Sequence, residues 1–258
     1  MATRNGRPPL DLNSDVGESF GRYTLGEDGA LFRFITSANV ACGLHAGDPL
    51  VMRATVRAAI QAGVAIGAHP GYPDLQGFGR RELRLNPEEV YSFTLYQLGA
   101  LAAFTQAAGV PLRHVKAHGA LYHQLAREAE LAQAFAQAMY DFSPALRVMT
   151  LPNSALEAAA QAMGLRVLRE GFADRAYRAD GSLVPRGEPG AVIHDPEAVV
   201  QRAVRMAVAG EVLTVKGEAV PLRIDTLCLH GDTPGAARLA ERVRSALEAA
   251  GVTLAAPA

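Results

Sequence analysis

Seven short apolar segments alternate with longer, alanine-rich amphipathic segments along the chain, and this alternation limits the possible folds more than any other feature. Strands that alternate with helices are typical of a parallel sheet with helical crossovers. Seven such units without a GxGxxG fingerprint favour a closed or nearly closed, irregular βα-barrel over a dinucleotide-binding fold. The strands are predicted near residues 8–13, 37–42, 64–69, 113–118, 147–151, 166–170 and 225–230, and the helices near 27–36, 48–62, 87–109, 119–140, 153–163, 195–209 and 233–250.

Three of the predicted helices begin with a clear start signal. Asp48, Asn86 and Asp195 are each followed by proline, and a capping side chain before proline is typical of the first turn of a helix. No low-complexity linker divides the sequence, so we expect one domain over residues 1–258. The one break in the alternation is a predicted β-hairpin insertion near 211–223.

The composition excludes several classes of protein. The chain has 258 residues, 49% hydrophobic and 20% charged, with a formal net charge of −1. A near-neutral chain has no long-range attraction for nucleic acid or an anionic membrane. No apolar run reaches the roughly 18 residues that span a bilayer, and the first residues lack the apolar core of a secretory signal. Cys42 and Cys228 are too few for a disulfide framework. We therefore expect a cytoplasmic protein without nucleic-acid or membrane partners.

Polar side chains share one face of several predicted strands. Asp11, Asn13 and Asp15 share one face in and just beyond the first strand, opposite the face of Leu10, Leu12 and Val16. Lys116 and His118 share a face of the fourth strand. Carboxylates and histidines inside a barrel are costly unless they are paired. Because barrel sites are built at the carboxyl ends of the strands, these residues predict a functional site there.

Lys116 is a strong candidate because the chain contains only two lysines, Lys116 and Lys216, and otherwise uses arginine. A lysine inside a barrel needs an anionic partner or an anionic ligand. Two interpretations stay open: a contact with substrate, or a structural pair with an aspartate such as Asp11.

Further candidate side chains lie within, at the end of or after the other predicted strands. They are Asn39, His45, His69, Arg80, Glu170, Asp174, Arg175, Arg186, His230 and Asp232. The alternative for the aspartates is a helix cap or a turn, and for the arginines a solvated surface position. An arginine fork also suits a carboxylate or a phosphate.

The absence of several motifs narrows the chemistry. The sequence contains no phosphate-binding GxxxxGK[ST] loop, no HExxH zinc motif and no GxSxG nucleophile elbow. The remaining carboxylates, histidines, lysine and arginines suit acid–base chemistry on a small anionic substrate, with or without a divalent metal.

Seven segments together resemble one known family. LDLNSDVGES, SANVACGLHAGDP, IGAHPGYPDLQGFGRR, VKAHGALY, EGFADRAY, LVPR and LCLHGD occur in this order between about residues 10 and 235. This combination resembles the LamB/YcsF family, which forms the A subunit of the ATP-dependent 5-oxoprolinase of prokaryotes. The resemblance implies an irregular seven-stranded βα-barrel related to carbohydrate deacetylases. It also implies ATP-driven opening of 5-oxo-L-proline to L-glutamate, together with the B and C subunits of 5-oxoprolinase.

The implied reaction gives each candidate an expected role. A base must activate water, an acid must protonate the ring nitrogen, and cations must bind phosphate and carboxylate. We expect the catalytic residues to be Asp15, His45, His69, Lys116, His118, Glu170 and His230. We expect the substrate-binding residues to be Asp11, Asn13, Asn39, Arg80, Asp174, Arg175, Arg186 and Asp232. ATP is expected as a co-substrate of the complex. Because this chain lacks a phosphate loop, phosphorylation is expected on the B and C subunits.

Two other functions remain open at this point. The first is a metal-dependent deacetylase or amidohydrolase, in which His45, His69 and Asp15 would be ligands. A divalent metal is compatible with the residues, but the sequence alone does not assign a metal site. The second is a non-catalytic protein that binds 5-oxoproline for its partners.

Overall fold

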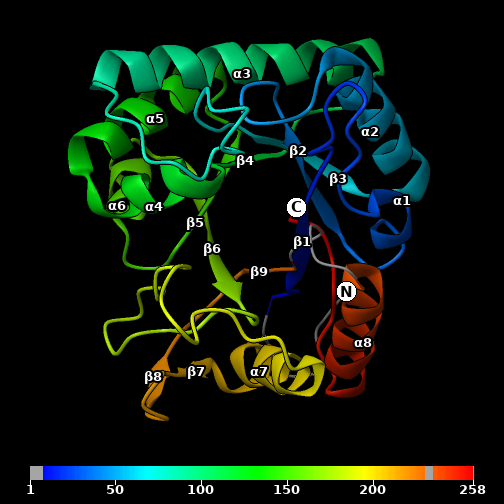
Figure 1. Ribbon diagram of the computed structural model, residues 1–258, viewed down its shortest axis with the longest axis vertical. Helices are drawn as coiled ribbons and strands as arrows, with labels where there is room; N and C mark the ends of the chain where they lie inside the picture. Colours follow the sequence, from blue (N-terminus) through cyan, green and yellow to red (C-terminus); the bar gives the residue numbers. More distant parts are fainter. Residues whose placement is uncertain (1–7, 230–234, 258) are drawn as a thin grey trace.

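The computed structural model describes residues 8–229 and 235–257, and its centre is a closed barrel of seven parallel strands (Figure 1). The strands follow the order β1-β2-β3-β4-β5-β6-β9, and β9 pairs with both β6 and β1 to close the barrel. Their bounds are β1 Asp11–Val16, β2 Ser37–Ala41, β3 Ala65–His69, β4 His114–Lys116, β5 Arg147–Thr150, β6 Arg166–Phe172 and β9 Thr226–Cys228. The predicted fold class is confirmed, and each predicted strand overlaps an observed one.

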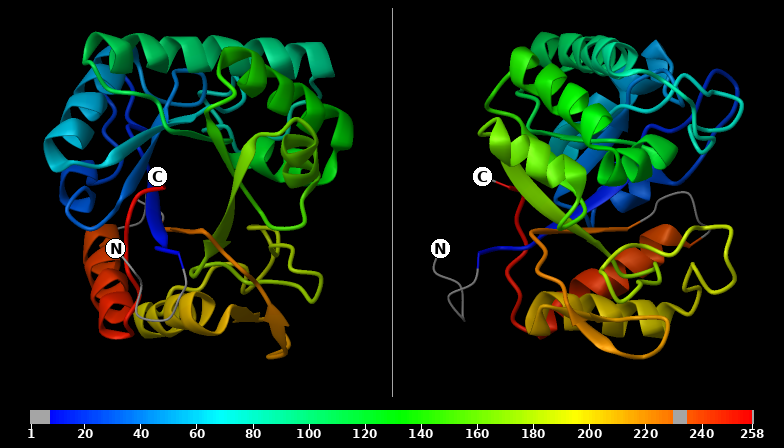
Figure 2. Two further views of the ribbon diagram at one scale, coloured as in Figure 1. Left: turned by 180° about the vertical axis from the view of Figure 1, so that it is seen from behind. Right: turned by 90° about the vertical axis from the view of Figure 1, so that its left-hand side faces the viewer.

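Helices surround the barrel on its outside (Figures 1 and 2). They are α1 Asp28–Leu31, α2 Pro49–Ala62, α3 Pro87–Ala107, α4 Gly119–Arg127, α5 Ala129–Phe142, α6 Ala155–Ala162, α7 Pro196–Ala209 and α8 Ala236–Ala249. The prediction of one helix over 119–140 is wrong, because Glu128 adopts an extended conformation between α4 and α5. This change of direction lets α5 pack against both α3 and α6. The predicted helix 27–36 is also too long, since α1 is a single turn.

The predicted helix starts are confirmed. Asp48 accepts hydrogen bonds from the backbone N–H groups of Leu50 and Val51 and caps α2. Asn86 caps α3 through a capping box with Glu89. Each such cap satisfies N–H groups that have no partner within the helix, and is worth about 1 kcal/mol.

The apolar core lies between the strands and the surrounding helices. Leu12, Val40, Val115 and Val148 are fully buried members of one large apolar cluster. Their neighbours along each strand point the opposite way, into the barrel. This division leaves the inner face of the barrel to polar side chains, whereas the interior of a βα-barrel is more often apolar.

A two-stranded antiparallel sheet stands apart from the barrel. It consists of β7 Glu211–Leu213 and β8 Ala219–Pro221, inside the predicted hairpin region 211–223. The backbone N–H of Val215 donates to the carbonyl of Tyr177, which ties the hairpin to the segment that follows β6. Among the described residues, no helix combines the length and apolar character that crossing a membrane would require.

Candidate active site

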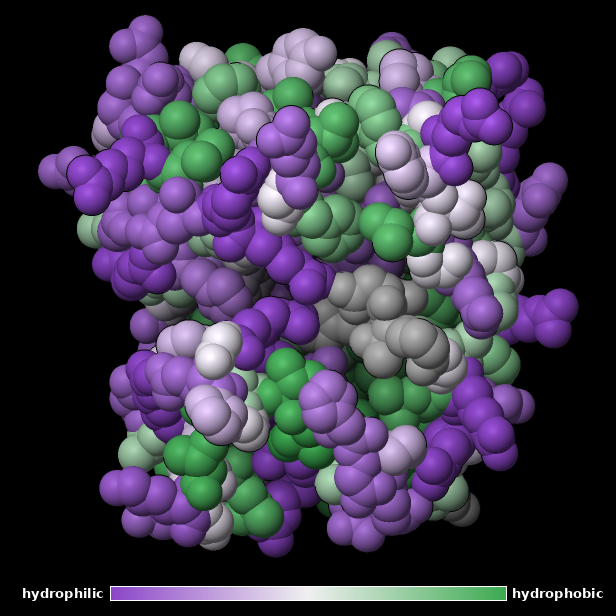
Figure 3. Space-filling model, in the orientation of Figure 1, coloured by the Kyte–Doolittle hydropathy of each residue, from purple (hydrophilic) through white to green (hydrophobic). Residues whose placement is uncertain are grey.

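The loops that follow β1, β3 and β6 lie on one side of the barrel, where the carboxyl ends of the parallel strands meet (Figure 2, right). A cavity of about 640 Å³ lies among them. Hydrophilic side chains meet across the middle of this face (Figure 3). The predicted site residues that line the cavity are Asp15, His69, Arg80, Lys116, His118, Arg175 and Arg186. The structure therefore brings these seven together at the end of the barrel where sites are built.

Lys116 lies at the end of β4 with 3% of its surface exposed. Its Nζ atom is 2.9 Å from Asp15 Oδ1 and 2.9 Å from Glu170 Oε1, and it donates to Cys228 Sγ at 3.1 Å. Burial lowers the pKa of this ammonium, but Asp15, Cys228 and Glu170 outweigh burial and raise it well above its ordinary value. A lysine–aspartate pair is thus present, but Asp11 is the wrong partner; the pair is with Asp15.

Polar side chains in the barrel interior support these two carboxylates. Asn13 donates to Glu170 Oε1 at 3.1 Å, and Asn39 donates to both Asn13 Oδ1 and Asp15 Oδ1 at 2.8 Å. Asp11, nearer the start of β1, accepts hydrogen bonds from hydroxyl groups. These contacts position Asp15 and Glu170. A direct contact of Asp11, Asn13 or Asn39 with substrate stays a prediction.

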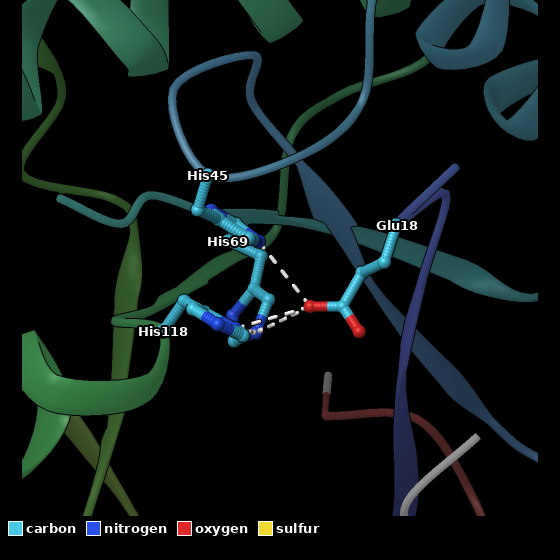
Figure 4. Close-up of side chains that lie close together, drawn as sticks. All are labelled: Glu18, His45, His69 and His118. Carbon is cyan, nitrogen blue, oxygen red and sulfur yellow. Dashed lines mark hydrogen bonds and ion pairs between the residues drawn. The ribbon is translucent and has the colours of Figure 1, made fainter. Parts of the chain in front are cut away.

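Three histidines converge on the carboxylate of Glu18, which lies in the loop after β1 (Figure 4). Glu18 Oε1 is 3.0 Å from His118 Nδ1, 3.2 Å from His45 Nε2 and 3.7 Å from His69 Nε2. His118 Nδ1 and His69 Nε2 are 3.0 Å apart. The ligand atoms of all four residues lie within 4.8 Å of one another. We refer to these four residues as the histidine–glutamate centre.

The hydrogen bonds of two of the rings fix where their protons lie. His69 Nδ1 is 2.8 Å from the Lys116 carbonyl, and His118 Nε2 is 2.8 Å from the Phe78 carbonyl. A carbonyl only accepts, so both nitrogens carry hydrogen. When both rings are neutral, His69 Nε2 and His118 Nδ1 carry lone pairs, which point at each other and at the Glu18 carboxylate. Only a cation, either a proton or a metal ion, can satisfy these three acceptors at once.

The spacing of the centre suits a metal ion. A tetrahedral site with bonds of about 2.0–2.1 Å separates its ligand atoms by roughly 3.3–3.4 Å, and the four separations given above, 3.0–3.7 Å, lie around this value. Metal-bound histidines usually donate their second N–H to a carbonyl, as His69 and His118 do. The sequence alone does not assign a metal site; the structure supplies a set of residues that can hold an ion.

Two glycines make room for the histidine rings. A Cβ atom on Gly71 would lie 2.5 Å from His45 Nδ1, and one on Gly79 would lie 2.7 Å from His118 Cδ2. Gly79 also has a φ of +63°, and the preceding Phe78 has a φ of +54° although it is not glycine. This uncommon backbone conformation aims the Phe78 carbonyl at His118 and accounts for the glycine-rich sequence after β3.

Burial and neighbouring charges shift the pKa values of His45 and His69 in opposite directions. Burial, together with the charge of His118, lowers the pKa of His45 to about 3. Burial also lowers the pKa of His69, but the carboxylates of Asp15 and Glu18 outweigh it, and the net direction is upward. Burial opposes ionisation of Glu18, yet hydrogen bonds from His118 and His45 bring its pKa below the ordinary value. The centre therefore keeps a carboxylate and a neutral imidazole side by side.

The remaining predicted residues lie as follows. Glu170 is fully buried behind Lys116, and Asp174 lies near enough to Arg175 to raise its pKa. His230 and Asp232 lie outside the described residues.

Sequence reasoning missed Glu18 and Tyr122. Glu18 follows Gly17, whose φ of +68° turns the chain back over the barrel. Its only sequence signal is membership of the LDLNSDVGE segment. Tyr122 lies in the first turns of α4, four residues after the N-cap residue His118, and lines the same cavity.

A closed βα-barrel with a buried lysine and a histidine–glutamate centre at its carboxyl end has the architecture of an enzyme active site. Residues 10–258 match the model of the LamB/YcsF family. The chain belongs to this family, and the resemblance predicted from the seven sequence segments is confirmed.

Several relatives are similar over nearly their whole length. The A subunit of 5-oxoprolinase from Pyrococcus abyssi is 55% identical over 243 residues, which cover 94% of this chain and 95% of the relative. That of Symbiobacterium thermophilum is 56% identical over 248 residues, with 96% and 95% covered. The crystal structure of a lactam utilization protein from Thermus thermophilus superposes with a TM-score of 0.93 at 50% identity, covering 97% of this chain and 100% of that one.

Proposed function

We propose that this chain is the A subunit of an ATP-dependent 5-oxoprolinase and that it opens the lactam ring of 5-oxo-L-proline. The names of the relatives support the reaction class. The observation that carries the proposal is the cavity in which Asp15 and Lys116 meet three members of the histidine–glutamate centre, Glu18, His69 and His118, beside several arginines. It combines a proton acceptor, a fixed cation and groups for an anionic substrate.

The reaction needs ATP because a lactam is a poor electrophile. Transfer of the γ-phosphoryl group to the lactam oxygen yields ADP and an activated ring carbon. One water then adds to that carbon, and the C–N bond breaks as the nitrogen gains a proton, which leaves an acyl phosphate. A second water hydrolyses the acyl phosphate to glutamate and phosphate. We place the water addition and ring opening on this chain, and ATP binding and phosphorylation on the B and C subunits.

The residues of this chain have distinct parts in the proposal. Asp15 lines the cavity and accepts from Lys116 and Asn39, so its carboxylate is held in place to take a proton from water and return it to the ring nitrogen. Lys116 stays charged because two carboxylates, those of Asp15 and Glu170, each lie 2.9 Å from its Nζ. Its charge balances the negative charge that develops on the substrate oxygens.

The histidine–glutamate centre, Glu18, His45, His69 and His118, fits a divalent transition metal by donor type and by spacing. Such an ion would supply Lewis-acid polarisation and a more acidic bound water. Metal analysis of the purified chain, with His69→Ala and His118→Ala as matched variants, tests this assignment. We expect about one ion per chain, lost in both variants. If the wild-type complex is active without metal, the facing acceptor atoms of the centre are instead satisfied by a shared proton.

The function is tested by reconstitution. This chain is purified and mixed with the B and C subunits, 5-oxo-L-proline and ATP, and glutamate is measured with each of the three proteins omitted in turn. We expect glutamate only from the complete mixture, because this chain has no recognisable phosphate loop. Steady glutamate production by the chain alone would overturn the division of labour. The reaction uses ATP, so the cytoplasm is the proposed compartment.

A second function is favoured by the histidine–glutamate centre alone. Metal-dependent amidohydrolases need a metal site and a general base but no ATP. The discriminating measurement is hydrolysis of acetylated sugars or simple lactams by the metal-loaded chain without ATP and without the partner proteins. Activity there would replace the 5-oxoprolinase proposal.

A further inference from the structure

Arg175 is a buried cation in the wall of the cavity. Only 2% of its surface is exposed, its Nη2 donates to the Val184 carbonyl at 2.7 Å, and its Nε has no hydrogen-bond partner among the described residues. Within residues 8–229 and 235–257, no carboxylate lies within ion-pair distance of it. Buried charges are costly unless they are paired, so this guanidinium is arranged for a partner that the described part of the chain does not supply.

The segment that carries Arg175 is held firmly in place. Arg202, on α7, donates to the carbonyls of Ala173 and Arg175. Backbone hydrogen bonds from Ala176 and Val184 then fold the rest of the segment into a compact unit. The guanidinium therefore has a fixed position in the wall of the cavity, and little conformational entropy is lost when a ligand binds.

Among the side chains that line the cavity, Tyr122 and Arg186 lie near enough to Arg175 to influence its pKa. Tyr122 lines the cavity and is 4% exposed. Burial raises the pKa of its hydroxyl, and the nearby Glu170 carboxylate raises it further. Among the described residues this hydroxyl makes no well-formed hydrogen bond. Arg186 also lines the cavity. Burial and the charge of Arg186 lower the pKa of Arg175 to about 10, while Asp174 acts in the opposite direction. An anion placed here would lie beside the guanidinium group of Arg175 and complete the hydrogen bonds of Arg175 and Tyr122.

We propose that Arg175, Tyr122 and Arg186 form a carboxylate-binding subsite that holds the α-carboxylate of 5-oxo-L-proline and selects carboxylated lactams over neutral ones. This inference rests on the proposed function. A carboxylate matches the planar arginine fork, and the phenolic hydroxyl donates a further hydrogen bond. Lys116 lines the same cavity, and its Nζ is 5.4 Å from the ring centre of Phe172, which packs edge to face against Tyr122. A substrate held at the subsite therefore lies in the same cavity as the charge of Lys116.

The test compares a charged and a neutral lactam in the complete complex. The KM and kcat for 5-oxo-L-proline are measured together with the inhibition constant of 2-pyrrolidinone, which has the same ring without the carboxylate. For Arg175→Gln we expect the KM to rise at least about 50-fold, the kcat to stay within about threefold, and the 2-pyrrolidinone constant to stay within about twofold. Tyr122→Phe, which keeps the shape of the side chain, should raise the KM about fivefold to tenfold and serves if Arg175→Gln does not fold.

Arg178 provides a matched control. It lies on the same segment and lines the same cavity, but its guanidinium is half exposed and already pairs with Glu188. Arg178→Gln should leave the KM within about twofold. An unchanged KM in both site variants, or equal weakening of both lactams, would refute the subsite. A fall in kcat alone would assign Arg175 to the transferred phosphoryl group and equally refute it. If the wild-type complex releases no glutamate, the proposed function fails instead, and the two failures are distinguishable.

Discussion

The buried lysine gives the sharpest prediction from this structure. Lys116 holds two carboxylates, Asp15 and Glu170, each 2.9 Å from its Nζ, and only 3% of its own surface is exposed. Lys116→Met removes the charge but keeps most of the chain length. It leaves two carboxylates without their shared cation, and breaking a buried pair in this way costs about 3–5 kcal/mol. We expect the free energy of unfolding to fall by that amount in urea titrations at pH 7.

The charge-conserving variant separates charge from shape. Lys116→Arg keeps the cation, but a guanidinium is larger than an ammonium and must fit among contacts of 2.9–3.1 Å. Overpacking typically costs about 1–3 kcal/mol. We expect the variant to fold and the turnover of the complete complex to fall at least about tenfold, equivalent to about 1.4 kcal/mol.

The other lysine of the chain is the control. Lys216 is exposed at the turn between β7 and β8, so Lys216→Arg should change neither stability nor turnover. The reasoning is refuted if the free energy of unfolding of Lys116→Met lies within about 1 kcal/mol of the wild-type value, or if Lys116→Arg retains full turnover. If Lys116→Arg does not fold, the lysine is structural, and its expected part in catalysis is lost.

Three further predictions concern other parts of the barrel. Burial raises the pKa of Asp28 to about 6, despite the hydrogen bond that its carboxylate accepts from a backbone N–H. Between about pH 4 and 6 the native state therefore keeps a proton that the unfolded state has lost, so the free energy of unfolding should fall as the pH rises through this range. Asp28→Asn should flatten this pH dependence in denaturant titrations. Gly67→Ala should cost more than about 3 kcal/mol in urea, because its Cβ would lie 2.0 Å from His114 Nε2. Cys42 and Cys228 should resist iodoacetamide at pH 8 in the native protein, since burial raises the pKa of both thiols.

Each of these measurements has an internal comparison. Gly99→Ala has open space around its added Cβ within α3 and should stabilise the chain slightly, by up to about 1 kcal/mol. If it destabilises as much as Gly67→Ala, the steric argument fails. Alkylation is compared with the urea-unfolded chain, where both cysteines should react; equal rates in both states would contradict the burial argument. An unchanged pH slope in Asp28→Asn would assign the slope to another group.

The fold could be predicted because its determinants are local. Helix starts at Asp48 and Asn86 depend on neighbouring residues, and the alternation of strands and helices defines a parallel barrel. The break at Glu128 was not predictable, because good helix formers lie on both sides of it and the packing of α5 decides the direction. Tertiary packing thus overrode local propensity there.

The candidate site could be predicted only in part, for a related reason. Asp15 in β1 and Lys116 in β4 could be assigned to the inner faces of their strands, because side chains alternate between the two faces of a strand. Glu18 lies in a loop, and its approach to three histidines from other loops depends on the turn at Gly17. The partner of Lys116 was predicted wrongly because the position of β1 relative to β4 across the barrel is set by closure, and not by either strand alone.

Closure of the barrel also determines the order in which the chain can fold. Asn13 in β1 pairs with Cys228 in β9, so the first strand receives its second neighbour only after nearly the whole chain has been made. The interior that β1 and β9 seal holds Lys116 and its carboxylates, which are costly to desolvate before they are paired. Contacts of such long sequence separation form slowly. During synthesis the chain therefore exposes an open, polar-lined sheet until its last strand is complete, and we expect fragments that end before β9 to aggregate.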